Sequence, residues 1–222
     1  MAVETRIHFV RHGEAENPQG IFYGRLAGFP LSERGIRQAR AAGACLRTTP
    51  LEAIYASPLE RTRQTAEWIA REHPHLQVTF TDLLIEVATP LEGQPFADLE
   101  SGKIDAYDKS PAHGGAAASA TAFPDPARSS EQPLEILQRM LRFVGGALAR
   151  HRGRELAAVT HGDCLAFLML WAAGSPLGRE ERLALYRERF LSRGSITTFT
   201  FTEVGEDKRP RVEYLKPEVP DA

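Results

Sequence analysis

Two short polar clusters stand out because each follows a run of apolar residues. Arg11, His12 and Gly13 follow the apolar run 7–10, and a second histidine, His161, follows the run 156–160. Runs of this length and composition predict buried strands, and a glycine after each histidine allows a sharp turn. Adjacent imidazole and guanidinium groups could bind an anion. An isolated Arg-His-Gly is also typical of a basic pair on the surface, so the rest of the chain must decide.

Two further residues complete a possible phosphoryl site. Arg61 lies near the start of a predicted helix that follows another strand, and Glu86 lies after a later one. Loops at the carboxyl ends of parallel strands form the crevice that holds ligands, so we expect Arg61 beside His12 and His161. Two guanidinium and two imidazole groups suit a dianionic phosphoryl group without a metal ion. Glu86 would supply the proton.

The elements that must position these residues alternate along the chain. Strands are expected at 7–10, 51–56, 76–80 and 156–160, and helices at 33–47, 58–72, 134–151 and 164–173. For the second helix, Ser57 is the expected cap and Pro58 the first helical residue. After a charged helix at 179–190, segments 195–202 and 211–215 are expected to form an edge hairpin. This order predicts a three-layer α/β/α sandwich with a mostly parallel central sheet.

The stretch from about 90 to 132 has no helical or strand periodicity. It is rich in glycine, alanine and proline, and unstructured loops beyond about 12 to 15 residues are usually lids, binding loops or disordered segments. We expect a partly irregular insertion over the site. The whole chain, 1–222, is expected to form one domain.

Composition narrows the possible partners. A net charge of -2 across 222 residues gives no basic field for nucleic acid, and no apolar run approaches the roughly 18 to 20 residues of a membrane span. Cys45 and Cys164 are widely separated and lack metal-ligand spacing, which fits a reducing compartment. We therefore expect a cytoplasmic protein that binds neither nucleic acid nor membrane.

Taken together, these blocks resemble the histidine phosphatase superfamily, in its phosphoglycerate-mutase-like branch. The matching blocks are 9–14 (FVRHGE), 31–35 (LSERG) with 38–39 (QA), 57–62 (SPLERT) with 65–66 (TA), Glu86 with 92–93 (EG), and 160–162 (THG). The resemblance implies a phosphohistidine mechanism without a cofactor. The implied catalytic residues are the nucleophile His12, the phosphoryl ligands Arg11, Arg61 and His161, and the proton donor Glu86. The implied substrate-binding residues are Asn17, Tyr23, Gly24 and Gly162.

Some positions depart from the family pattern. Asn17 follows His12 by five residues, where six is usual, and Asp163 stands close enough to His161 to be an alternative proton donor. We expect Glu86 to be the donor, with a pKa raised by burial or by a carboxylate such as Glu14. We also expect His161 to be protonated.

Three functions fit the sequence. The first is hydrolysis of a small phosphomonoester, the second a cofactor-dependent phosphoglycerate mutase-type transfer, and the third phosphate binding without turnover. The full set of catalytic residues disfavours the third. Dedicated mutases carry a tryptophan before the asparagine and a Gly-Trp pair, whereas this chain has Glu16 and Arg25-Leu26, which favours the phosphatase.

Overall fold

The computed structural model describes residues 3–95, 131–188, 190–202 and 209–219. Its centre is a six-stranded sheet with the order β3-β2-β4-β1-β5-β6. The strands are β1 (Glu4–Arg11), β2 (Leu51–Ala56), β3 (Val78–Phe80), β4 (Glu155–Thr160), β5 (Ile196–Thr202) and β6 (Arg211–Leu215). Strands β1 to β4 run parallel, and β5 and β6 add antiparallel partners at one side. The predicted mostly parallel sheet and edge hairpin are therefore confirmed.

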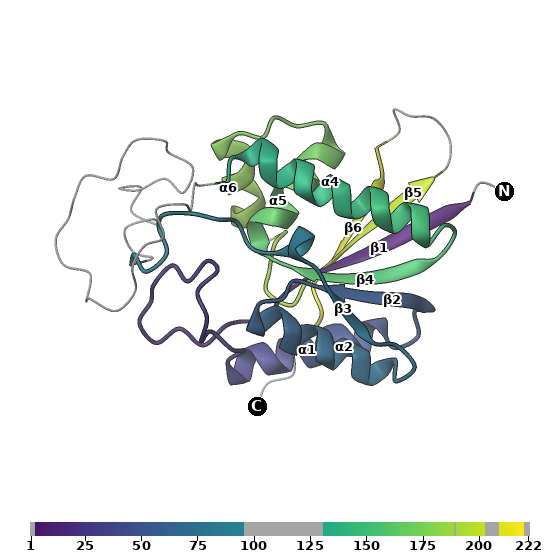
Figure 1. Ribbon diagram of the computed structural model, residues 1–222, viewed down its shortest axis with the longest axis horizontal. Helices are drawn as coiled ribbons and strands as arrows, with labels where there is room; N and C mark the ends of the chain where they lie inside the picture. The colour runs from purple at the N-terminus through teal and green to yellow at the C-terminus, as the bar shows by residue number, and fades with distance from the viewer. Residues whose placement is uncertain (1–2, 96–130, 189, 203–208, 220–222) are drawn as a thin grey trace.

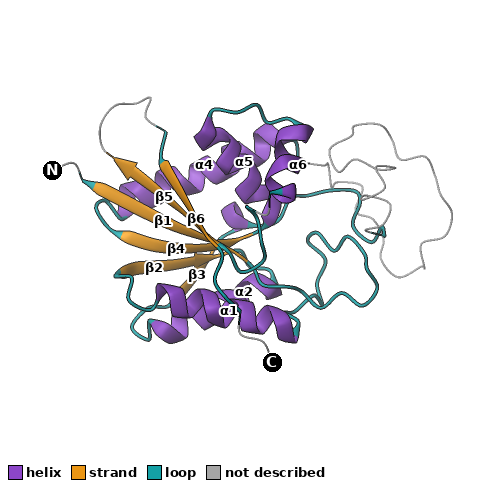
Figure 2. Ribbon diagram, turned by 180° about the vertical axis from the view of Figure 1, so that it is seen from behind, coloured by secondary structure: helices purple, strands orange, loops and turns teal. Residues whose placement is uncertain are grey.

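Helices cover both faces of the sheet (Figures 1 and 2). One face carries α1 (Glu33–Leu46) and α2 (Glu60–Glu72), and the other carries α4 (Pro133–Arg150) and α5 (Gly162–Ala173). The short α6 (Arg179–Arg187) lies beside α5, and the one-turn helix η1 (Asp82–Leu84) packs against α4. This is the predicted three-layer α/β/α sandwich. Of the predicted insertion at 90–132, residues 96–130 lie outside the described residues.

The alternation of strand side chains creates a separate core on each face. Phe9 of β1 points toward α4 and α5, where its ring makes edge contacts with Phe143 and Phe199 at centroid distances of 6.0 and 5.3 Å. The next residue, Val10, packs in the other core with Ile54. Successive side chains of a strand face opposite sides of the sheet, so burial on both sides makes β1 apolar and central.

The start of α2 differs from the prediction. The helix begins at Glu60, with Leu59 as its N-cap, rather than at Pro58. Ser57 instead extends the pairing of β2 with β4 by one residue, because its N–H donates to the Val159 carbonyl over 3.0 Å. Its hydroxyl is turned toward His161, 2.8 Å away. A residue expected to cap a helix therefore belongs to the polar end of the sheet.

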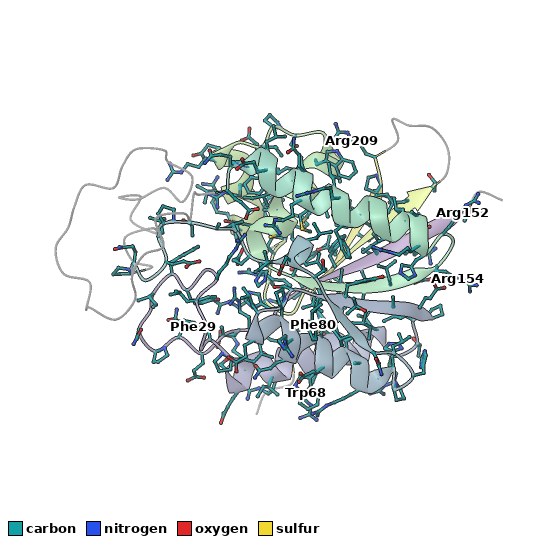
Figure 3. All side chains as sticks on the ribbon, viewed as in Figure 1. Phe29, Trp68, Phe80, Arg152, Arg154 and Arg209 are labelled. Atoms are coloured by element: carbon teal, nitrogen blue, oxygen red, sulfur yellow. The ribbon has the colours of Figure 1, made fainter. Side chains whose placement is uncertain are left out.

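The outer faces of the helices are polar and charged. On α2, the half-buried ring of Trp68 lies at the surface (Figure 3), with the guanidinium carbons of Arg40 and Arg71 at 5.2 and 3.9 Å from its centroid. These distances are typical of cation–π contacts.

No helix in the described part of the chain is both long enough and apolar enough to traverse a bilayer.

The turn after β1 packs directly on the first turn of α1. A Cβ at Gly13 would overlap the carbonyl oxygen of Gly35, and one at Gly35 would overlap the carbonyl oxygen of Glu14. Ser32 caps α1 by accepting from the Gly35 N–H over 3.1 Å, and its own N–H donates to the Glu14 carbonyl over 2.9 Å. The two glycines thus let a helix start hold the turn that carries His12.

Replacing Gly35 with alanine should destabilise the fold by about 1 to 3 kcal/mol, because the added methyl group forces backbone apart in a packed region. Gly145→Ala on α4 is the matched control, since a Cβ there meets nothing within 4 Å. Alanine is about 1 kcal/mol better than glycine inside a helix, so the control should be neutral or stabilising. Urea unfolding measures both, and equal effects would contradict the close contact.

Candidate active site

The two histidines meet at the carboxyl ends of neighbouring parallel strands. Arg11 of β1 pairs with Thr160 of β4, and the His12 N–H donates to the Thr160 carbonyl over 3.1 Å. The rings of His12 and His161 consequently lie 5.1 Å apart, centroid to centroid. Arg61, in the first turn of α2, reaches the same point. The structure therefore brings these three side chains together as the sequence predicts.

The hydrogen bonds of His12 define its tautomer. Nδ1 lies 2.6 Å from the carbonyl oxygen of Gly13, which can only accept, so Nδ1 carries the proton. Nε2 then presents its lone pair, which accepts from the Nε–H of Arg61 over 3.3 Å. Burial, together with the charges of Arg61 and Arg11, holds the pKa of His12 well below its ordinary 6.5. The result is a neutral imidazole with an unprotonated Nε2, the form in which a histidine can act as a nucleophile.

His161 is also held neutral, contrary to the expected protonated form. Its Nδ1 accepts from Nη2 of Arg61 over 3.2 Å, so Nε2 carries the proton and donates to the Ser57 hydroxyl over 2.8 Å. Burial is the main cause that lowers its pKa, and the charge of Arg61 is the next. The sequence identified His161 as a site residue, but it did not reveal the burial that keeps the side chain neutral.

Arg11 and Arg61 place two positive charges close to the histidines. Arg61 is buried under the ring of Tyr23, 4.7 Å from its centroid, and its Nη2 donates to the Gly24 carbonyl over 2.7 Å. Arg11 donates through Nη1 to the Leu191 carbonyl, while its buried Nε has no hydrogen-bond partner among the described residues. A buried donor without a partner costs free energy, and an anion at this point would satisfy it.

Glu86 faces both Arg61 and His161. Its Oε2 lies 3.8 Å from Nη2 of Arg61 and 3.5 Å from Nδ1 of His161. Burial raises the pKa of Glu86 to about 7, against the charge of Arg61, and the carboxylate of Asp163 adds to the rise. The expected neighbour, Glu14, is instead turned toward Arg193, which donates to it over 3.2 Å. Glu86 can therefore hold or release a proton near neutral pH.

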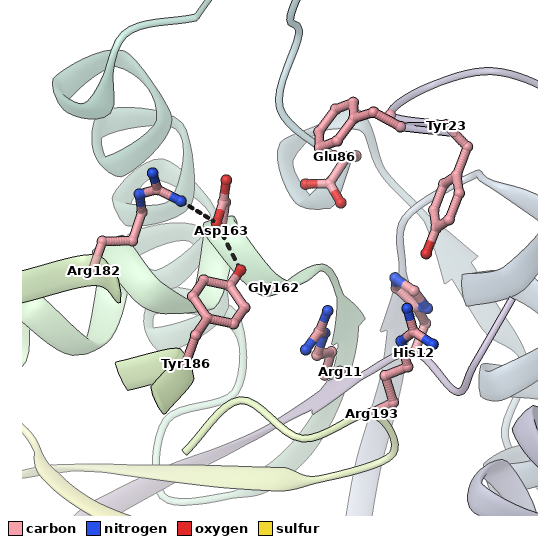
Figure 4. Close-up of a pocket in the computed structure, with 11 residues that line it drawn as sticks. Arg11, His12, Tyr23, Glu86, Gly162, Asp163, Arg182, Tyr186 and Arg193 are labelled. Carbon is pink, nitrogen blue, oxygen red and sulfur yellow. Dashed lines mark hydrogen bonds and ion pairs between the residues drawn. The ribbon is translucent and has the colours of Figure 1, made fainter. Parts of the chain in front are cut away.

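Arg11, His12 and Glu86 line a pocket of about 200 Å³ (Figure 4), and Arg61 and His161 are not among its lining residues. Its walls are Arg11, His12, Phe22, Tyr23, Gly24, Glu86, Gly162, Asp163, Arg182, Tyr186 and Arg193. Asp163 accepts at one oxygen from the Tyr186 hydroxyl over 2.6 Å and from Arg182 over 3.3 Å. A Cβ at Gly162 would lie 2.5 Å from that hydroxyl oxygen and 3.1 Å from the guanidinium carbon of Arg11, so a larger residue there would displace both side chains.

A family model described as "Histidine phosphatase superfamily (branch 1)" matches residues 7–208. The chain belongs to this superfamily. It is 36% identical over 182 residues to "Uncharacterized protein Rv0525" of Mycobacterium tuberculosis, which covers 82% of this chain and 85% of that protein. It is 30% identical over 182 residues to "Probable phosphoglycerate mutase GpmB" of Proteus mirabilis, with 81% and 80% covered. The fold matches mycobacterial glucosyl-3-phosphoglycerate phosphatase Rv2419c with a TM-score of 0.72 at 22% identity, over 97% and 100% of the two chains.

In this member of the superfamily, Asn17 is set apart from the other predicted site residues. Its side chain bonds back to both the N–H and the carbonyl of Ile21, at 3.2 and 2.9 Å. It lines a neighbouring hollow with Glu14 and Arg193 rather than the pocket that holds His12. Its contact with substrate stays a prediction. Tyr23, Gly24 and Gly162 do line the pocket.

Five side chains at this site were not predicted from the sequence. They are Phe22, Ser57, Arg182, Tyr186 and Arg193. The last three come from α6 and the loop before β5, far along the chain from both polar clusters, and no pattern pointed to them. The position of Ser57 directly after a buried strand was an available signal, because His12 and His161 occupy the same position on their own strands.

His12, Glu86 and His161 each offer one atom that could bind a metal ion, and these three atoms lie within 4.8 Å of one another. The guanidinium group of Arg61 lies among them, however, and hydrogen-bonds to both imidazoles. A divalent cation there would be repelled by this buried charge. The electrostatics thus suit an anion better than a metal.

We predict that the carboxyl group of Glu86 titrates near pH 7. A pH titration by ¹³C NMR of protein labelled at glutamate side chains measures this, and Glu86→Gln identifies the resonance. Asp163→Asn should shift the midpoint to lower pH, because a nearby negative charge favours the protonated acid. A midpoint near the unperturbed value of about 4.3 would contradict the prediction.

Proposed function

We propose that the protein hydrolyses small phosphomonoesters through a phosphohistidine formed on His12. The observation that supports this most directly is the state of His12, whose Nδ1 proton is bound to the Gly13 carbonyl while the Nε2 lone pair faces two arginines and a second histidine. No metal ion or cofactor is required, since the positive charge comes from Arg11 and Arg61.

In the first step, Nε2 of His12 attacks phosphorus in line with the ester oxygen. The new N–P bond forms as the P–O bond to the alcohol breaks, and Glu86 gives its proton to the departing oxygen. Arg11 and Arg61 donate to the phosphoryl oxygens, on which charge is spread in a loose transition state, and His161 orients the Arg61 guanidinium group by accepting from its Nη2. The preorganised, buried donors make this electrostatic contribution large.

In the second step, water attacks the same phosphorus and the N–P bond breaks. Glu86, now ionised, accepts a proton from the water, and inorganic phosphate leaves while His12 returns to its neutral form. A group that alternates as acid and base works best with a pKa close to the operating pH. The pKa of about 7 for Glu86 fits that requirement.

A pocket of about 200 Å³ fits a small phosphorylated metabolite. The similarity to "Probable phosphoglycerate mutase GpmB" supports a second candidate, in which phosphohistidine transfers its phosphoryl group to another hydroxyl. Product analysis separates the two, because hydrolysis yields free phosphate and the mutase reaction yields an isomer. Absence of both products across sugar phosphates, phosphoglycerates and phosphoserine would favour binding without turnover.

Rapid acid-free quench with ³²P-labelled substrate should trap a phosphoprotein that is labile in acid and stable in base. The assay is run with EDTA present, because the proposed chemistry uses no metal. His12→Ala should lose the label entirely. The exposed His75 provides a matched control, and His75→Ala should label as the wild type does. Label retained on His12→Ala would overturn the assignment of His12 as the nucleophile, and loss of label in EDTA would overturn the metal-free mechanism.

Removing the proton donor should affect poor leaving groups most. An aliphatic alcohol must be protonated as it leaves, whereas nitrophenolate departs without help. Glu86→Gln should therefore lower kcat/KM for an aliphatic phosphate by at least roughly tenfold more than for nitrophenyl phosphate, since general acid catalysis contributes typically 10² to 10⁴-fold.

Asp163→Asn is the matched comparison, because it makes the same carboxylate-to-amide change at the rival donor. Assayed at a pH below the Glu86 midpoint of both proteins, it should lower kcat/KM for both substrates to a similar extent, since Asp163 is already hydrogen-bonded to Tyr186 and Arg182. If the leaving-group dependence appears with Asp163→Asn and not with Glu86→Gln, the roles of the two carboxylates are reversed.

A further inference from the structure

Glu86 lies in a segment without a strand or helix ladder, between η1 and the turn near residue 90. The carbonyls of residues 83–86 are held instead by side chains of other elements. Arg139 donates through Nη1 to residues 83 and 85 over 3.0 and 2.8 Å, Thr160 donates to residue 84 over 2.7 Å, and Arg25 donates through Nε to residue 86 over 2.6 Å. The backbone of the proposed proton donor therefore depends on two arginines.

Both arginines converge on Glu131. Nη2 of Arg25 lies 2.6 Å from Oε2 of Glu131, and Arg139 binds both carboxylate oxygens, through Nε at 2.8 Å and Nη2 at 3.0 Å. The same carboxylate accepts from the Ala88 N–H over 3.1 Å. Burial acts to raise the pKa of Glu131, but the hydrogen bonds and charge of Arg139 outweigh it and leave that pKa lowered. Glu131 is therefore ionised and joins Arg25, Arg139 and the Ala88 backbone.

Arg139 occupies the apolar side of α4 and is 7% exposed, among core residues such as Met140. Burying a guanidinium group costs free energy unless it is paired and hydrogen-bonded. Here Nε and Nη2 of Arg139 are paired with Glu131, and Nη1 reaches the carbonyl oxygens of residues 83 and 85, just before Glu86. A cation kept in a core position and aimed at these carbonyls indicates a role beyond packing.

Arg25 extends the network to the phosphoryl site. It follows Gly24, whose carbonyl accepts from Arg61, and its own N–H donates to Glu92 over 2.6 Å. The loop that orients Arg61 and the segment that carries Glu86 are therefore joined through one arginine. Their relative placement sets the 3.8 Å separation between Glu86 and Arg61.

We propose that Glu131 is a positioning residue which, through Arg25 and Arg139, fixes the carboxyl group of Glu86 for proton transfer. This inference rests on the proposed function, in which Glu86 is the proton donor. Neither Glu131 nor the two arginines would touch the reacting atoms.

The test is Glu131→Gln, assayed against a series of aryl phosphates and one aliphatic phosphate. The amide keeps the size of the side chain, but its NH₂ cannot accept from an arginine. We expect kcat/KM for the aliphatic substrate to fall about tenfold more than for nitrophenyl phosphate, a part of the full contribution of general acid catalysis. The matched control is Glu135→Gln, because Glu135 caps α4 nearby and, among the described residues, hydrogen-bonds to the Gln132 N–H and not to the network. It should behave as the wild type.

A double-mutant cycle separates positioning from general damage. If Glu131 acts through Glu86, adding Glu131→Gln to Glu86→Gln should cost no further activity toward the aliphatic substrate. Equal losses with all leaving groups, or full additivity, would overturn the positioning role. Should Glu131→Gln fail to fold, Arg25→Gln at the rim of the network, with 26% of its side chain exposed, takes its place with the same expected dependence.

The two proposals fail in distinguishable ways. If the loss of kcat/KM in Glu86→Gln does not depend on the leaving group, the assignment of Glu86 as the proton donor is wrong. If Glu86→Gln shows it while Glu131→Gln and Arg25→Gln do not, the proposed function stands and the positioning role is wrong.

Discussion

The site is organised around one buried guanidinium group. Arg61 is 1% exposed, yet in the described part of the chain its charge is paired with a carboxylate only at 3.8 Å, from Glu86. It is stabilised by hydrogen bonds to His12, His161 and the Gly24 carbonyl and by the face of Tyr23. Acceptors without formal charge leave the net charge positive. A binding site for an anion is the direct consequence.

The same charge, together with burial, fixes the protonation states around it. Burial is the main cause that lowers the pKa of both histidines and the charge of Arg61 adds to it, so both are neutral, and their tautomers follow from the donors and acceptors on each side. A carboxyl group there would ordinarily ionise, but burial of Glu86 outweighs the cation. Burial and charge act together on His12 and oppose each other on Glu86, which places a neutral imidazole beside a carboxyl group that titrates near pH 7.

The sequence predicted the sheet and the central residues because both follow local rules. Apolar runs mark the buried strands, and polar residues just past them must lie at one edge. Glu131 could not be found this way, because it ends a stretch without periodicity and acts through contacts made only in the folded chain. Arg139 did leave a signal, a cation between the core positions Ile136 and Phe143, but its partners depend on tertiary packing. The neutral state of His161 likewise depends on burial, which spacing does not reveal.

The strand order has a consequence for how the protein acquires its structure during synthesis. Of the described strands, β1 pairs only with β4 and β5, and β2 reaches β1 only across β4. A nascent chain that has not yet exposed residues 155–160 can join β2 to β3 but leaves the apolar β1 without a partner. His12 is therefore made early and positioned late. Unpaired apolar strands are prone to aggregate, which makes the interval between the two histidines the vulnerable period of biosynthesis.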